Sequence, residues 1–452
     1  MSENYEQVLD KVNTYSSPSD LKITDMRFTD IVGAPMHCTL MKIYTNQGLV
    51  GFGEVRDGAS RQYAAMLKSR LIGENPCDVD RLFRRIKQFG GHARQAGGVC
   101  GVELALWDLA GKAYNVPVYQ MLGGKFRDEV RIYCDTDVDG KHTGTEMGQA
   151  LKARMEMGFT FLKMDLGLGI LLGEPGTINA PLGYIDWMFA KGGEKPTDPV
   201  EANVWRNRRY DRFNVMHPLT GIHVTEKGFD MLEQYVADVR AVIGYEIPLA
   251  IDHFGHIGVE DCIKLCRRIE KYNIAWAEDM IPWQLTDQYI RLSQSTTVPI
   301  CTGEDIYLKE NFKPLLEARA VSVIHPDLLS SGGILENKKV GDMAQDYGVA
   351  MAMHMAESPI TAMAAVHSIA ATENFYVCEN HSVDVPWWND ITIGTPKKIV
   401  ENGFIKVPNK PGLGIDDLND EVLAEHLHPD YPELWAPTDA WNTDPAHDRL
   451  WS

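Results

Sequence analysis

Eight short apolar runs between residues 129 and 380 constrain the fold more than any other feature of the sequence. Most are followed by a helix-length amphipathic segment such as VEDCIKLCRRIEKYN, a pattern that predicts a parallel sheet covered by helices. Eight such runs predict a (β/α)8 barrel, whose active site lies at the carboxyl ends of the strands. Most of the runs end in an acid or a histidine. In chain order they are VRIYCD, FTFLKMD, IPLAID, IAWAED, VPICTGE, AVSVIHPD, VAMAMHMAE and NFYVCE.

The chain before these runs has a different pattern, which predicts a separate α+β domain. Residues 21–55 alternate as three strands of a meander, and three helical patterns follow, the last ending at Asn115 before Pro117. A stretch rich in Gly, Pro, Asn and aromatics interrupts the βα rhythm, so we expect an insertion after the second barrel strand. The expected order is a polar tail at 1–20, an α+β domain at 21–128, a barrel at 129–400 with its insertion near 166–221, and a segment at 401–452 that returns to the first domain.

Composition excludes several classes of partner. The 452 residues include 44 Lys and Arg against 63 Asp and Glu, and a net charge of −19 argues against a nucleic-acid binder or a polybasic membrane anchor. The polar amino-terminal stretch does not read as a signal peptide, and no window approaches about 18 consecutive apolar residues. The eight cysteines are scattered without a C-x-x-C pair, as is typical of reduced structural cysteines. We therefore expect a cytoplasmic protein.

Three acids mark the ends of three consecutive predicted strands. They are Asp252, Glu278 and Glu304, and both intervals equal one βα unit (278 − 252 = 26 and 304 − 278 = 26). A single acid at a strand end is most simply a helix cap. Three at equal spacing would lie side by side at the barrel mouth, where their mutual repulsion requires a cation. Because oxygen ligands of this kind select a hard ion, the sequence predicts a Mg²⁺ site.

Further polar residues end other runs. Asp327 and His354 are one unit apart (354 − 327 = 27), and an Asp beside a His fixes the imidazole tautomer and stabilises its protonated form. We therefore interpret His354 as a general base, although a lone histidine would more often be structural. Lys163 is a candidate for neutralising a metal-bound carboxylate, with a snorkelling surface lysine as the alternative. Glu379 is a candidate hydrogen-bond donor to a bound carboxylate, with an ordinary capping or loop acid as the alternative.

With these residues in place, the chain resembles the enolase superfamily, and within it the mandelate racemase-like branch. The resemblance covers nearly the whole chain and rests on GVELALWDLAGKAYNVPVYQMLGGKFRDEV, the D…E…GE series of acids, HPDLLSSGGI and His354. It implies a modified (β/α)7β TIM-type barrel with an α+β capping domain built from the amino-terminal region and the C-terminal tail. It also implies one Mg²⁺ and removal of the proton α to a carboxylate.

Departures from the family pattern narrow the predicted reaction. Racemases of this branch typically carry K-x-K on strand two, whereas this chain has Lys163-Met164-Asp165, so the second base is missing. One histidine base with Mg²⁺ suits a lyase that dehydrates a sugar acid, an aldonate or aldarate, to a 2-keto-3-deoxy acid. The general acid for the departing hydroxyl stays open, with His253, His256 and His354 itself as candidates.

Substrate specificity is expected in the capping domain, as it is in the family, and in loops at the barrel mouth. The candidate contacts are His37 in the loop IVGAPMH, Arg56 in RDGASRQ, Asp165 on strand two and Trp387 after strand eight. For Trp387, stacking on a sugar ring and packing in the core are equally good interpretations. The expected partner is a small-molecule carboxylate, and the resemblance also implies a homo-oligomer.

Three other interpretations stay open. An epimerase or a one-base cycloisomerase would keep the same fold and metal. A non-catalytic barrel scaffold would have lost metal or base positions, which are all filled here. A zinc hydrolase barrel would need H-x-H at the end of strand one, but the H-x-H of this chain is His426-Leu427-His428, in the terminal segment.

Overall fold

The computed structural model describes residues 16–136, 138, 140–171, 174–179, 196–211, 222–254 and 257–443. Half of the predicted insertion and the candidate acid His256 lie outside the described residues. The chain divides into two compact units, which we describe one at a time. Unit 1 takes its residues from Met1–Cys134, Gly303–Lys313 and Ile324–Ser452, and unit 2 from Asp135–Thr302 and Pro314–Val323.

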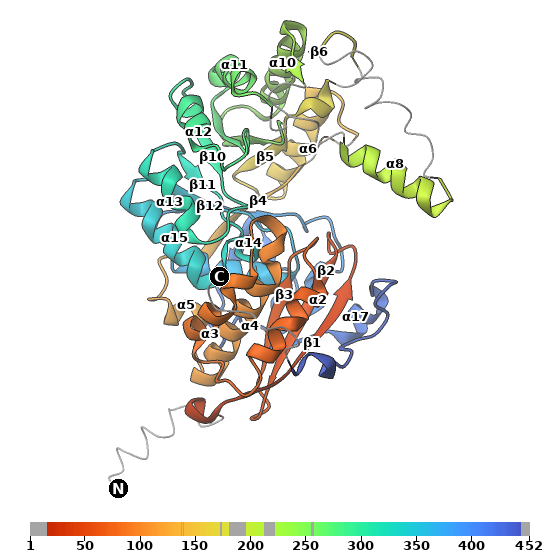
Figure 1. The fold of residues 1–452 in the computed structure, drawn as a ribbon. Helices are drawn as coiled ribbons and strands as arrows, with labels where there is room; N and C mark the ends of the chain where they lie inside the picture. The colour runs from red at the N-terminus through yellow and green to blue at the C-terminus, as the bar shows by residue number, and fades with distance from the viewer. Residues whose placement is uncertain are drawn as a thin grey trace. The chain divides into compact units, whose positions relative to one another are not determined.

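Unit 1 begins with the predicted meander, which forms an antiparallel sheet of three strands (Figure 1). The strands are β1 (Ile23–Ile31), β2 (Cys38–Thr45) and β3 (Val50–Val55), and their apolar side chains are buried. The helix α4 (Gly97–Tyr114) packs on β3 so closely that a Cβ at Gly53 would lie 2.1 Å from a backbone oxygen of α4. Glycine in β3 is therefore what lets the sheet and the helix approach each other.

Three helices of unit 1 coincide with the predicted helical patterns, although the first two are shorter than those patterns. The helix α4 ends at Asn115 in the left-handed conformation, followed by Pro117, which is a usual way to stop a helix. The other helices of this unit are α2 (Arg61–Ala65), α3 (Val79–Ile86), α5 (Val118–Met121), α14 (Leu328–Ser331), α15 (Ile334–Asp346), α16 (Pro359–Ala370) and α17 (Asp420–Glu425), and α13 (Lys309–Glu317) begins here.

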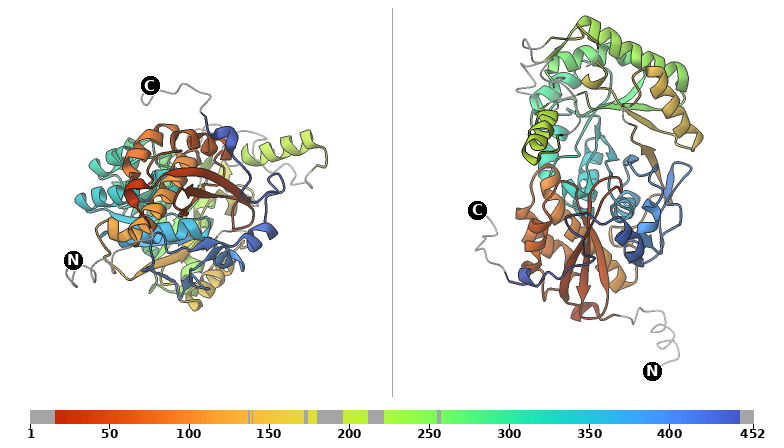
Figure 2. Two further views of the ribbon diagram at one scale, coloured as in Figure 1. Left: turned by 90° about the horizontal axis from the view of Figure 1, so that it is seen from below. Right: turned by 90° about the vertical axis from the view of Figure 1, so that its right-hand side faces the viewer.

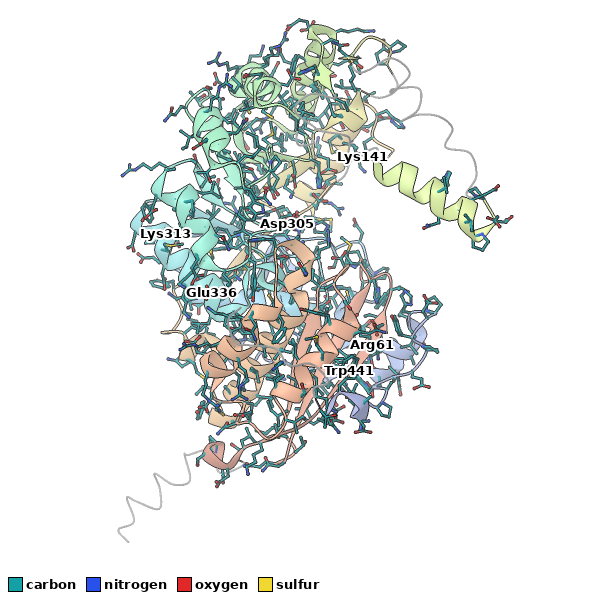
Figure 3. The ribbon with its side chains drawn as sticks, viewed as in Figure 1. Arg61, Lys141, Asp305, Lys313, Glu336 and Trp441 are labelled. Atoms are coloured by element: carbon teal, nitrogen blue, oxygen red, sulfur yellow. The ribbon has the colours of Figure 1, made fainter. Side chains whose placement is uncertain are left out.

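The C-terminal segment of unit 1 runs beside strand β1, as both views of Figure 2 show. Backbone bridges join Phe28 to Ala436 and Ile31 to Leu427, both antiparallel. Arg61, labelled in Figure 3, extends from α2 to this segment and lies 4.7 Å from the centroid of the Tyr431 ring. Backbone bridges thus join the first strand to the C-terminal segment of the same chain.

Unit 1 also contains three parallel strands from the apolar runs. The strand β13 (Phe375–Asn380) pairs on one side with β4 (Glu129–Cys134) and on the other with β12 (Ala350–Met353). The short strand β16 (Phe404–Lys406) adds to the other edge of β4 in the antiparallel direction, and β15 (Val400–Glu401) follows it. A further two-stranded pair joins β14 (Thr392–Ile393) to β17 (Asp417–Leu418).

Unit 2 contains the middle βα repeats. Its parallel neighbours run in the order β5 (Leu162–Asp165), β8 (Leu249–Asp252), β9 (Ile274–Glu278) and β10 (Ile300–Thr302). The helices of this unit are α6 (Gly144–Glu156), α8 (Pro199–Asp211), α10 (Glu226–Ile243), α11 (Val259–Ile269) and α12 (Thr286–Ser293), and β6 (Ile178–Asn179) pairs with β7 (His223–Val224).

All eight predicted runs form strands, the remaining one being β11 (Val323–Ile324). Parallel strands that alternate with helices are the architecture of a TIM-type barrel, and the meander with its helices is a separate α+β domain. The predicted fold class is therefore confirmed. In the described part of the chain, no helix combines the length and apolar character needed to cross a membrane.

Candidate active site

In unit 1, Asp327 orients His354 through a short hydrogen bond. Asp327 caps α14, and its Oδ1 accepts the backbone N–H groups of Leu329 at 2.6 Å and Ser330 at 3.1 Å. Its Oδ2 lies 2.5 Å from Nδ1 of His354, and a parallel backbone bridge joins the same two residues. The helix start fixes the carboxylate, and the carboxylate fixes the imidazole so that Nε2 is the nitrogen left for chemistry.

Arg56 forms an ion pair with Asp327 of this dyad. It is the first residue after β3, its side chain is 1% exposed, and its guanidinium nitrogen Nη1 lies 2.5 Å from Oδ2 of Asp327. Nε of Arg56 lies 3.9 Å from Glu357, and Nη2 lies 4.0 Å from Glu304. Burial alone would raise the pKa of Asp327, but Arg56 and His354 outweigh it and lower that pKa to about 2. Asp327 is therefore a permanent anion at neutral pH.

Carboxylates surround the other side of the His354 ring. Nε2 lies 3.5 Å from Oε2 of Glu304 and 3.9 Å from Oε2 of Glu379. Burial favours the neutral imidazole, but Glu304, Asp327 and Glu379 prevail and raise the pKa of His354 to about 10. The surrounding carboxylates thus stabilise the protonated form of this ring.

Glu379 stands between several histidines of unit 1. It is fully buried near the carboxyl end of β13, and its Oε1 lies 3.2 Å from Nε2 of His381, the residue directly after that strand. Its Oε2 lies 3.7 Å from Nε2 of His325, and the Tyr133 hydroxyl lies 3.1 Å from that same nitrogen. His354, Glu379 and His381 can bring one ligand atom each within 4.8 Å of one another.

In unit 2, two buried acids share one lysine. Asp252 and Glu278 end the neighbouring parallel strands β8 and β9, and Nζ of Lys163 on β5 lies 2.7 Å from the first carboxylate and 3.5 Å from the second. The indole N–H of Trp276 also donates to Oε2 of Glu278, at 2.8 Å. Lys163 is buried, so the snorkelling alternative for this residue does not apply.

Asp165 and His253 form a second contact at the same strand ends. Oδ1 of Asp165 lies 2.9 Å from Nδ1 of His253, which lies 3.6 Å from Oδ2 of Asp252. Asp252 and Asp165 together raise the pKa of His253 above its usual range. The backbone of His253 has a φ of 58°, which turns the chain directly after β8. The position that holds a lysine in the K-x-K pattern here holds a carboxylate engaged with a histidine.

The donor set of unit 2 fits a hard divalent cation. Asp252 and Glu278 offer only oxygen atoms, they are buried together, and the single ammonium of Lys163 faces both of them. Carboxylate oxygens are preferred ligands of Mg²⁺, whereas the imidazole nitrogens of the His354, Glu379 and His381 group suit softer metals. Of the two groups, the unit 2 pair is the better match for the predicted ion.

The loop candidates His37 and Trp387 contact the C-terminal segment. Nε2 of His37 lies 3.0 Å from the buried Asp30, and its ring stacks on His428 with centroids 4.5 Å apart. Trp387 stacks on His426 at 3.6 Å with the planes 7° apart. Both histidine rings of the H-x-H motif thus stack on side chains from loops of unit 1. Among the described residues, no group that could hold a metal ion includes them.

Comparison with known proteins matches both halves of the chain to one family. Residues 17–123 match the family described as mandelate racemase / muconate lactonizing enzyme, N-terminal domain, and residues 146–421 match the enolase C-terminal domain-like family. The chain belongs to the enolase superfamily. Its membership agrees with the predicted resemblance.

Named relatives and a solved structure extend this result. This enolase superfamily member is 32% identical to the D-xylonate dehydratase of Haloferax volcanii over 93% of this chain and 92% of that protein. It is 26% identical to the D-galactonate dehydratase of Ralstonia pickettii over 88% and 93%. A mandelate racemase/muconate lactonizing enzyme-like protein from Rubrobacter xylanophilus superposes with a TM-score of 0.75 at 27% identity, covering 91% and 99%. The chain is an enzyme, of the hydro-lyase type that its relatives' names describe.

Sequence reasoning did not find every polar residue of this superfamily member's candidate site. It did not find Glu357 near Arg56, His325 and His381 around Glu379, or Trp276 against Glu278. For three of them a signal existed, because Glu357, His325 and His381 lie within three residues of a strand-end residue that the sequence did single out. Trp276 lies inside an apolar run, where a tryptophan reads as core.

Proposed function

We propose that this enzyme is a Mg²⁺-dependent dehydratase of a sugar acid, an aldonate or an aldarate. The observation that carries the proposal is the buried Arg56–Asp327–His354 assembly, which supplies one oriented base. The names of the relatives support the reaction class and the kind of substrate. The product would be a 2-keto-3-deoxy acid. The homo-oligomer expected from the resemblance stays a prediction, which light scattering would test.

His354 would remove the proton α to the substrate carboxylate. Nδ1 is held by Asp327, so Nε2 accepts the proton, and the imidazolium that results is stabilised by an anion that does not itself become protonated. Arg56 acts as a positioning residue, because it keeps Asp327 ionised and fixed. This arrangement resembles the orientation of a catalytic histidine by aspartate in other proton-transfer enzymes.

Asp252, Glu278 and Glu304 are the residues that would hold Mg²⁺. When bound, the ion would supply Lewis-acid stabilisation of the negative charge that develops on the substrate carboxylate. Lys163 would add positive charge beside Asp252 and Glu278 and help to receive the substrate's carboxylate. Glu379 is proposed to contact the same substrate group, and His37, Asp165 and Trp387 to contact the hydroxyl-bearing chain.

The contact between Asp165 and His253 favours a one-base reaction. A racemase or epimerase with two bases needs a second group that can accept a proton on the opposite face of the substrate. Here the corresponding position is an aspartate that is hydrogen-bonded to a histidine. This position therefore does not provide the lysine of the K-x-K pattern.

The test is an assay of the full chain with Mg²⁺ against a library of aldonic and aldaric acids in D₂O. A dehydratase would form a 2-keto acid, followed by its ultraviolet-absorbing semicarbazone, with deuterium incorporated at C3. Exchange of the α-proton without any keto acid would favour the epimerase or cycloisomerase. The absence of exchange with every acid would favour the non-catalytic scaffold.

A further inference from the structure

The end of strand β3 carries two buried charged residues. Glu54 and Arg56 are two positions apart, the spacing at which side chains of an extended chain point to the same side. The opposite side of β3 is covered by α4, because a Cβ at Gly51 or Gly53 would lie within 2.3 Å of a backbone oxygen of that helix. Glu54 therefore points away from α4, and its side chain is completely buried.

Glu54 accepts three hydrogen bonds from the beginning of α16. Its Oε1 accepts the backbone N–H of Ser358 at 3.2 Å, and its Oε2 accepts the hydroxyls of Ser358 at 2.5 Å and of Thr361 at 2.7 Å. Ser358 is also the N-cap of α16, since its Oγ accepts the backbone N–H of Ile360 at 3.2 Å. The carboxylate of Glu54 thus fixes the position at which this helix begins.

The base His354 is only four residues before this helix start (358 − 354 = 4). His354 directly follows β12, and every residue from 354 to 358 is buried. Its backbone N–H donates to the carbonyl of Pro326 at 3.1 Å, next to Asp327. The backbone of His354 is therefore fixed on one side by the segment that carries Asp327, and on the other by the Ser358 that Glu54 contacts.

The two charged residues of β3 thus contact the two segments that meet in the dyad. Arg56 lies 2.5 Å from Asp327, and Glu54 contacts the segment that follows His354. Nδ1 of His354 and Oδ2 of Asp327 are 2.5 Å apart, a short contact that depends on the placement of both backbones. A shift of either segment would lengthen this contact and turn the ring.

We propose that Glu54 is a positioning residue for His354, an inference that rests on the proposed function. Glu54 fixes the backbone that follows His354, and Arg56 fixes Asp327. Together they keep Nδ1 of the imidazole on Asp327, which determines where Nε2 points, because the two nitrogens belong to one rigid ring. Glu54 acts on the reaction only through this orientation. Its loss should lower the rate roughly 100-fold, as a misplacement of about 1 Å can in an active site.

The experiment compares Glu54→Met with Glu103→Met. Methionine has nearly the length of glutamate, but its sulfur is a weak hydrogen-bond acceptor. Glu103 is also a buried carboxylate of unit 1, which accepts two backbone N–H groups at the start of α15 and one indole N–H. Both changes remove the acceptor of three hydrogen bonds, but the start of α15 does not follow the base.

The first measurement needs no substrate. The proton between Nδ1 of His354 and Asp327 should give an NMR signal far downfield of the amide protons, because the contact is short and charge-assisted. Its absence in His354→Asn assigns it. Glu54→Met should lose this signal or shift it upfield, whereas Glu103→Met should keep it. The milder Ser358→Ala, which removes one of the three donors to Glu54, should shift the signal in the same direction by less.

The second measurement uses a sugar acid that the wild-type chain dehydrates. Glu54→Met should lower kcat roughly 100-fold and leave KM unchanged, because a misdirected base weakens the proton transfer and not the binding of substrate. Glu54→Gln should recover most of the rate, since its amide oxygen accepts the N–H of Ser358 and its NH₂ donates to the two hydroxyls. Glu103→Met should keep the wild-type kcat.

The NMR signal decides the proposal in either direction. An unmoved signal in both Glu54→Met and Ser358→Ala overturns it, and so does an equal change in Glu103→Met. A lower melting temperature with an unmoved signal and an unchanged kcat would assign Glu54 a purely structural role. If Glu54→Met does not fold, Ser358→Ala decides by the same signal. If the wild-type chain dehydrates no sugar acid, the proposed function fails, whereas the signal still reports whether Glu54 positions His354.

Discussion

The two clusters of strand-end acids differ in the cations that accompany them. In unit 1 Asp327 is held by the buried guanidinium of Arg56, by backbone amides and by His354. In unit 2 Asp252 and Glu278 share the ammonium of Lys163. Arginine does not lose its proton in proteins and fixes a carboxylate in one geometry, whereas lysine is a compact charge on a flexible stem. We propose that the first cluster orients a proton acceptor and that the second receives a further cation.

The largest effect should come from removing the oriented base. In His354→Asn we expect the dehydration rate to fall roughly 100- to 10,000-fold, because the amide cannot accept the α-proton. Exchange of the α-proton in D₂O, followed by NMR, should fall in parallel. Persistent exchange in this variant would contradict the assignment of His354 as the base.

A matched control for this variant is His223→Asn. His223 is a half-exposed residue of unit 2 that the proposed mechanism does not use. This variant should keep the wild-type rates of exchange and dehydration. A loss of activity in it would mean that the effect of an asparagine for histidine change is not specific to the base.

Replacing Arg56 by Met tests the guanidinium that supports the dyad. It leaves the buried Asp327 without its cation, and breaking a buried pair costs about 3–5 kcal/mol in the free energy of unfolding. Denaturant unfolding should show that loss, and kcat should fall because the imidazole is no longer held. Arg56→Lys should recover part of both. The same change at Arg81, whose ion pairs with Glu74 and Asp78 are exposed, should cost at most about 1 kcal/mol.

Glu278→Gln probes the cluster of unit 2. Loss of a residue that only hydrogen-bonds a metal ligand weakens metal binding about 10- to 100-fold. Glu278 is a proposed direct ligand. We therefore expect the Mg²⁺ concentration that gives half activity to rise by at least that factor. Titration of the metal-free enzyme with Mg²⁺ measures it. Glu260→Gln, which changes an exposed acid paired with Arg291, is the control and should titrate as the wild type does. Identical titrations for both variants would remove Glu278 from the ligand set.

The smallest expected effect tests how burial alone shifts the pKa of a histidine in unit 1. His367 is fully buried, with Nδ1 accepting the backbone N–H of Tyr119 at 3.3 Å, and burial lowers its pKa to about 4. Its folded pKa lies below the usual 6.5, so its contribution to stability is complete above pH 6.5 and is lost as the pH falls toward 4. The loss should be about 1 kcal/mol per pH unit.

His367→Gln should therefore unfold with a shallower pH dependence than the wild type between pH 6.5 and 4. Denaturant unfolding at several pH values in this range measures both slopes. Equal slopes would show that the buried ring does not titrate in this window. His354 is also buried, but carboxylates surround it and its pKa moves in the opposite direction. The contrast indicates that neighbouring charge, more than burial, sets the behaviour of the base.

Local patterns were sufficient to predict many elements. The apolar runs are strands because each can bury both faces, and α4 ends at Asn115 because the left-handed turn and the following proline stop it. The dyad of Asp327 and His354 was also predictable, since residues one βα unit apart at strand ends become neighbours. Arg56 was predicted as a substrate contact, and its described partner is Asp327. Nothing local indicates that pairing, because the two residues are far apart in the chain.

The sequence by itself determined the strand order, the residues at the strand ends and the missing K-x-K lysine, since these depend on periodicity and residue type. The tertiary structure alone decided which charge faces which. It placed Lys163 against two acids, Arg56 against Asp327, and His381 against Glu379. The physical reason is that a hydrogen bond or ion pair depends on ångström distances between side chains, and only the packed fold fixes those distances.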